Sequence, residues 1–168
     1  MIALDTDRGR PPEMVVAAVA AIVRNASGHM IAGSNMSLYA FSAIAAEALT
    51  IIEGLSLAAS LNISSFILES DSAPLIPALN LPKYSLDWTA APLFWKIRSL
   101  SESFTSISWL WSSRQANQAA DFVAALASRR MCPVDWVSNP PSSFLALLSV
   151  DSSHILSQDF VPSGFDVG

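Results

Sequence analysis

Two acidic residues, Glu47 and Asp71, stand where they could share one site. Glu47 lies in an apolar stretch with helical periodicity, AEALTIIEGLSLAASLN, and Asp71 follows a short apolar strand at 66–68. A helix that leads into a strand brings the chain back to one sheet, so the two carboxylates are expected to approach each other. Carboxylates that are distant in sequence and close in space are what a divalent cation requires. The pattern therefore predicts a metal site beside this sheet.

The elements that would position these acids form an α/β pattern. Alternating or continuous apolar residues predict strands at 2–7, 14–24, 29–39, 65–70 and 106–111. Helices are predicted at 42–61, 72–79, 90–104 and 117–128, with Ser70 or Asp71 available to cap the second. On a helical wheel Glu47 lies at the edge of the apolar arc, whereas Glu53 points away from it. This order predicts a mixed sheet of five strands, three antiparallel strands first, flanked by helices.

Composition limits the class of protein and the kind of partner. The 168 residues are 52% hydrophobic and 14% charged, which is typical of one folded domain. A net charge of −5 argues against strong non-specific binding to nucleic acid. Cys132 is the one cysteine, which excludes an internal disulfide and a Cys-based zinc site. We expect no small-molecule cofactor, and the oligomeric state stays open.

The chain is expected to be soluble and intracellular, in the cytoplasm or the nucleus. The longest apolar run, at 14–23, is shorter than the ~20 residues of a membrane helix, and no signal peptide is visible. No membrane partner is therefore expected. From Met131 onward Pro, Ser and Asp accumulate and helix signals fade. This shift predicts one domain at 1–130 and a Pro/Ser-rich C-terminal tail at 131–168.

The sequence around four acidic residues, in separate parts of the chain, resembles that of a known family. Asp7 ends the first predicted strand, Glu47 lies in AEAL, Asp71 in ESDS and Asp121 in RQANQAAD. With the strings AIVRNASGHMIAG and SSRQANQAADFVAALA, the chain resembles the type 1 ribonuclease H (RNase H) domain. More narrowly, it resembles the reverse-transcriptase-associated RNase H-like proteins of plants, many derived from non-LTR retroelements. The resemblance covers about residues 1–130 and implies an RNase H-like fold; PPSSFLALLSVD resembles the segment after that domain in the plant proteins.

The resemblance implies metal-dependent endonucleolytic hydrolysis of the RNA strand of RNA–DNA hybrids. Two Mg²⁺ ions, for which Mn²⁺ can substitute, would activate the water and stabilise the leaving oxygen. The resemblance assigns them to Asp7, Glu47, Asp71 and Asp121. The hybrid would be recognised through 2′-hydroxyls across its minor groove. Arg114 and Asn117 are candidates for substrate binding, although Arg114 could equally anchor its own loop.

Each candidate residue also has a purely structural interpretation. Asp5 faces the same side as Asp7 and is its rival, and Glu47 alone is typical of a solvated helix edge. Asp71 could cap a helix, and Asp121 is a favourable charge near a helix N-terminus. The tryptophans of the last strand, Trp109 and Trp111, favour strand packing over base stacking.

Three departures from the family pattern predict reduced activity. Trp111 stands where active members carry a histidine, which as a general acid–base group typically contributes roughly 10²–10⁴-fold. The glycines common around the second strand are replaced by Ala18, Ala20 and Ala21, and a basic protrusion is missing, since 80–104 offers only Lys83, Lys96 and Arg98. The alternative is a catalytically impaired relic or a nucleic-acid or protein interaction module. An exonuclease of the same superfamily fits the three-strand opening less well.

Overall fold

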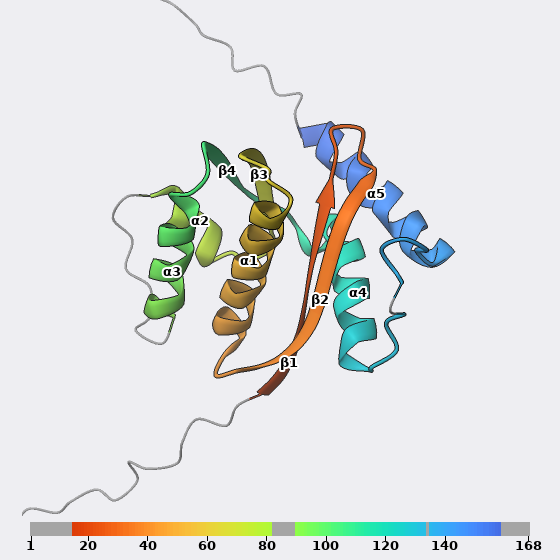
Figure 1. Cartoon of the computed structure of the whole chain (residues 1–168), viewed down its shortest axis with the longest axis horizontal. Helices are drawn as coiled ribbons and strands as arrows, with labels where there is room; N and C mark the ends of the chain where they lie inside the picture. The colour runs from red at the N-terminus through yellow and green to blue at the C-terminus, as the bar shows by residue number, and fades with distance from the viewer. Residues whose placement is uncertain (1–14, 82–89, 134, 159–168) are drawn as a thin grey trace, which may run out of the picture.

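A computed structural model describes residues 15–81, 90–133 and 135–158 (Figure 1). The first predicted strand, 2–7, and with it Asp7 lies outside the described residues. Four strands are present in the described part, in two separate pairs. The α/β architecture is thus observed, while the single mixed sheet and the count of five strands stay predictions.

The first pair of strands is an antiparallel hairpin. It consists of β1 (Val15–Arg24) and β2 (Met30–Ala40). The turn between them is closed by the side chain of Asn25, which accepts two backbone hydrogen bonds of 3.0 and 2.9 Å within the turn. An ion pair of 3.4 Å between Arg24 and Glu69 links the end of β1 to the second pair of strands.

The second pair is parallel and joins β3 (Ser65–Ser70) to β4 (Ser106–Trp111). Its register pairs the last residues of both strands, and the amide of Ser112 continues the ladder by donating to the carbonyl of Ser70 at 3.0 Å. Because the strands are parallel, their carboxyl ends lie at one edge of the sheet. The residues that follow β3 and β4, including Asp71, therefore emerge side by side.

Helix α1 (Ala43–Ser60) is the central helix. Ser42 caps it by accepting from the amide of Ala45 at 3.2 Å. Its inner face packs with α2 (Leu75–Asn80) and α3 (Ala91–Ser101) into one apolar cluster, and it also lies against β1 (Figure 1). By length and composition alone α1 could cross a membrane, but its inner face is buried in the apolar cluster of this domain.

Two further helices cover the opposite face of the hairpin. In Figure 1, α4 (Gln118–Ser128) lies against the hairpin and α5 (Ser142–Gln158) lies beyond it. A short 3₁₀ turn, η1 (Arg114–Ala116), leads into α4. The second apolar cluster forms here, and its largest members are Trp136 and Phe144, whose rings meet edge to face at 5.6 Å.

Two local predictions were wrong. The segment after residue 130 forms α5 and buries Phe144 and Leu148, because apolar side chains recur there at helical spacing despite the Ser and Pro content. The division of the chain into domains at that residue is a separate prediction that these contacts leave open. Helix α2 begins at Leu75, without a side-chain cap at its first position, so neither Ser70 nor Asp71 caps it.

Candidate functional site

Asp71 lies directly after β3, at the carboxyl edge of the parallel pair. Its Oδ2 accepts a hydrogen bond of 3.1 Å from Nε of Arg114, and its backbone carbonyl accepts one of 3.3 Å from the indole Nε1 of Trp111. Trp111 is the last residue of β4, and Arg114 lies in the segment that follows this strand. The parallel register therefore places the side chains of two distant segments around one carboxylate.

Glu47 reaches the same edge from α1. Its Oε2 accepts a hydrogen bond of 2.5 Å from Oγ of Ser72, which is fully buried. The Ser72 oxygen in turn accepts from the amide of Leu75 at 3.4 Å, at the start of α2. Glu47 is thus held beside the residue that follows Asp71, as expected for a carboxylate at the edge of the helix's apolar face.

Arg114 is the positively charged residue beside the three candidate acids that the structure describes, Glu47, Asp71 and Asp121. Its hydrogen bond to Asp71 raises the pKa of the guanidinium, and the charges of Asp71, Asp121 and Glu47 act in the same direction. All three carboxylates are therefore within electrostatic reach of one guanidinium. The Arg114 side chain is 78% exposed, so it lies over the acids on the solvent side.

Asp121 lies in the first turn of α4, and its pKa is raised. Burial is the largest cause, the charge of Asp71 is the next, and Arg114 opposes both. A neighbouring carboxylate disfavours the charged form of an acid, and Asp71 acts on Asp121 in this way, after burial. Asp121 also meets the positive end of the α4 dipole.

The donor set fits Mg²⁺ in its chemistry, because carboxylate oxygens are the ligands that this ion prefers. Within the described residues, however, no three acid, His or Cys side chains are grouped closely enough to hold a metal ion. Ser72 engages Glu47, and Arg114 engages Asp71. In this arrangement the guanidinium of Arg114 supplies one positive charge beside the acids, and it is paired with Asp71.

The remaining predicted residues lie around the same edge or outside the described part. Trp111 is 49% exposed and oriented by its bond to the carbonyl of Asp71, while Trp109 packs against the first apolar cluster, as predicted. Asn117 occupies the N-cap position of α4, but its side chain makes no capping hydrogen bond. Asp7 cannot be placed among the described residues. The catalytic and substrate-binding roles of all these residues stay predictions.

Two residues at the site were missed from the sequence. Ser72 bonds Glu47, and Asp151 of α5 is buried and accepts from the amides of Gln118 and Ala119. Asp151 could have been found, because it continues the helical spacing of apolar residues through PPSSFLALLSVD. Nothing local to ESDS indicates that its second serine, and not its first, bonds a helix 25 residues earlier.

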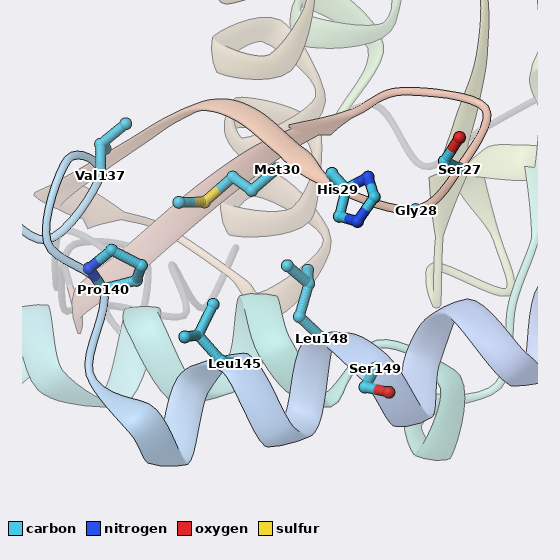
Figure 2. A pocket seen from close by; sticks show the side chains of 9 residues that line it. All are labelled: Ser27, Gly28, His29, Met30, Val137, Pro140, Leu145, Leu148 and Ser149. Atoms are coloured by element: carbon cyan, nitrogen blue, oxygen red, sulfur yellow. The ribbon is translucent and has the colours of Figure 1, made fainter.

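A separate hollow of about 380 Å³ lies between the β1–β2 turn and α5. Figure 2 shows Leu145 and Leu148 pointing from α5 toward Met30 and His29 of the hairpin. None of the candidate acids lines it. The hollow is therefore distinct from the acid site at the carboxyl edge of the parallel strands.

Comparison with solved structures defines the fold class as RNase H-like. The chain is similar to RNase H1 from the halophilic archaeon Halobacterium salinarum NRC-1, with a TM-score of 0.64 and 22% identity over 73% of this chain and 92% of that chain. It is also similar to an N-terminal RNase H domain from Mycobacterium tuberculosis, solved as a fusion with maltose-binding protein. There the TM-score is 0.59, with 20% identity over 70% of this chain and 94% of that chain.

The family is shown by the sequence itself. Residues 13–127 match the model of the reverse transcriptase-like family, and the chain belongs to this family. A comparison with curated proteins gave no match. The resemblance to an RNase H domain that the motifs predicted is thereby confirmed.

Proposed function

We propose that the chain is a metal-dependent endonuclease that hydrolyses the RNA strand of RNA–DNA hybrids, with reduced turnover. The observation that carries the proposal is that Asp71 pairs with Arg114 and Glu47 bonds Ser72 at the carboxyl edge of β3 and β4, with Asp121 within electrostatic reach of Asp71 in an RNase H-like fold. The solved structures that the chain resembles are an RNase H1 and an RNase H domain. We also propose that the protein acts in the cytoplasm or the nucleus.

Asp7, Glu47, Asp71 and Asp121 are the residues that would hold two Mg²⁺ or Mn²⁺ ions. When bound, such ions activate a water and stabilise the leaving oxygen of a phosphodiester. The chain's own contribution is to orient the acids. Ser72 orients Glu47, and the indole of Trp111 orients the backbone at Asp71. Asp7 would complete the set from the end of the predicted first strand.

Arg114 has a second role in this proposal. Arg114 now pairs with Asp71, and if Asp71 held a divalent ion instead, the guanidinium would be available as a strong donor to phosphate oxygens. Its exposure allows it to reach a backbone laid across the acids. Asn117, at the start of α4, would contact the same strand. Reduced turnover is expected from Trp111, because an indole N–H cannot act as a general base.

A non-enzymatic interaction module is the second candidate, and a specific observation favours it. Within the described part of the chain the acids do not form a preassembled metal cluster, and Arg114 already pairs with Asp71. A module of this kind would bind a partner while Asp71 stays paired with Arg114. It would need no divalent ion.

The test is cleavage of a labelled RNA–DNA hybrid in Mg²⁺ and, separately, in Mn²⁺. We expect slow cleavage by the native chain and a loss of about 10²-fold or more in Asp71→Asn, since a ligand to the metal is removed. Glu53→Gln is the matched control, because it removes an acid from α1 outside the site, and it should cleave normally. Absence of cleavage in both metals at high enzyme concentration would contradict the proposal. Hybrid binding without a divalent ion, unchanged in Asp71→Asn, would support the interaction module.

A further inference from the structure

The carboxylate of Asp151, on α5, accepts hydrogen bonds from the first amides of α4. Asp151 is 1% exposed, and its Oδ1 and Oδ2 accept from the amides of Gln118 and Ala119 at 3.1 and 2.8 Å. The first amides of a helix have no partner within the helix. The usual partner is the N-cap side chain, but Asn117 does not fill that role here. A residue of the C-terminal helix does so instead.

The start of α4 is also where the candidate site is built. Arg114 begins the turn η1 that leads into the helix, and Asp121 lies in the first helical turn, with its amide bonded to the carbonyl of Asn117 at 3.2 Å. Two bonds from one rigid carboxylate fix both the position and the direction of the backbone that they hold. A shift of this backbone would move both Asp121 and Arg114 relative to Asp71.

Asp151 is itself firmly held. Phe144, on the same helix, is fully buried and meets Trp136 edge to face, and Leu148 is buried in the same cluster. The charge of Asp151 also adds to the causes that raise the pKa of Asp121, after burial and Asp71. The two carboxylates are therefore within electrostatic reach of each other as well as being linked through the helix.

We propose that Asp151 is a positioning residue of the nuclease site and that α5 is a working part of that site. Its buried carboxylate fixes the first turn of α4 and so sets where Asp121 and Arg114 stand relative to Asp71. The part of this inference that concerns metal binding rests on the proposed function. The part that concerns the backbone does not.

The experiment compares the native full-length chain with two variants. Asp151→Asn keeps the shape of the side chain but turns an N–H₂ group toward one amide, so one hydrogen bond becomes a contact between two donors. Phe144→Leu is the matched control, because it weakens the packing of α5 but keeps the Asp151 carboxylate that accepts both bonds. Amide exchange by NMR reports on the backbone, and calorimetric titration with Mn²⁺ reports on the site.

We expect the amides of Gln118 and Ala119 to exchange faster in Asp151→Asn, relative to the amides of α1, by about tenfold or more for the amide that loses its acceptor. The other amide should change less, because it keeps a neutral acceptor in place of a charged one. In Phe144→Leu these amides should change only in proportion to α1. Mn²⁺ affinity should fall by about threefold to tenfold in Asp151→Asn, which is less than the loss for residues that contact metal ligands directly. It should stay unchanged in Phe144→Leu.

Equal acceleration of the Gln118 and Ala119 amides in both variants would overturn the inference, as would an unchanged Mn²⁺ affinity in Asp151→Asn. The proposed function fails if the native chain does not bind Mn²⁺, or if Asp71→Asn binds Mn²⁺ as well as the native chain does. The amide exchange then still decides whether Asp151 fixes α4. Asp151→Ser, which retains a smaller oxygen acceptor, replaces Asp151→Asn if the latter does not fold.

Discussion

Gly33 in β2 lies directly beneath the indole of Trp136, and alanine at this position should be destabilising. A Cβ on Gly33 would overlap with Cη2 of the ring and lie 2.8 Å from Cζ2 and 3.1 Å from Cζ3. Carbon atoms at optimal contact are about 3.5–4.0 Å apart, so the ring or the strand must move. Trp136 is 6% exposed and packed edge to face on Phe144, which leaves it no free direction. We expect Gly33→Ala to lower the free energy of unfolding by about 1–3 kcal/mol.

Gly33→Ala should no longer be destabilising when the indole of Trp136 is absent. Trp136→Ala alone should cost about 3–5 kcal/mol. In that background Gly33→Ala meets no ring and restricts the unfolded chain, so it should be neutral or stabilise by up to about 1 kcal/mol. The four proteins form a double-mutant cycle, measured by equilibrium urea unfolding, with a coupling energy of about 1–4 kcal/mol.

Gly54 of α1 supplies the matched control. A Cβ there would meet only the Cβ of Ala21 at 3.9 Å, an ordinary contact. Gly54→Ala should therefore stabilise the protein by about 0.5–1 kcal/mol through helix propensity. The packing of Trp136 on β2 would be refuted if Gly33→Ala proved as harmless as Gly54→Ala. An equal cost of Gly33→Ala with and without the ring would refute it too.

Three further substitutions test the charges and the aromatic residue at the acid site. Arg114→Gln should change stability by less than about 1 kcal/mol, because its ion pair is exposed, yet tighten Mn²⁺ binding by freeing Asp71; weaker binding on calorimetric titration would contradict this. For Asp121, the raised pKa means that the native state binds more protons than the unfolded state between pH 3.8 and the raised value, so this group's contribution to stability falls as pH rises through that window. Asp121→Asn without metal should therefore melt higher than the native chain at neutral pH and equally below pH 3.8, and a lower melting temperature at neutral pH would count against the electrostatic interpretation. Trp111→His should raise hybrid cleavage by about 10²-fold, whereas Trp95→His, on the exposed side of α3, should leave it unchanged.

The sequence predicted most of the described fold because its local signals agree with its tertiary contacts. The turn at residues 25–28 combines Asn and Gly between two apolar runs, and the structure has a hairpin there. Ser42 precedes a long run of helical periodicity and caps α1. The two short apolar runs that became β3 and β4 were found with their bounds, since turn residues flank them on both sides.

The features that the sequence did not predict depend on contacts between distant segments. The Pro and Ser content after residue 130 masked the apolar spacing that forms α5, and the buried role of Asp151 depends on amides 33 and 32 residues earlier. The bond between Ser72 and Glu47 depends on how α1 approaches the end of β3. The pairing of Arg114 with Asp71 depends on the parallel register, which periodicity alone cannot set.

The bonds from Asp151 also bear on how the chain can be shortened. The family match ends at residue 127, and a fragment cut there would still contain every candidate acid. It would, however, leave the leading amides of α4 without acceptors and open the packed side of that helix, where Ala119 and Val123 are buried, to water. Such a fragment should aggregate or unfold. If it showed no cleavage in a nuclease assay, the cause would be the loss of packing around α4 and not the loss of a candidate catalytic residue.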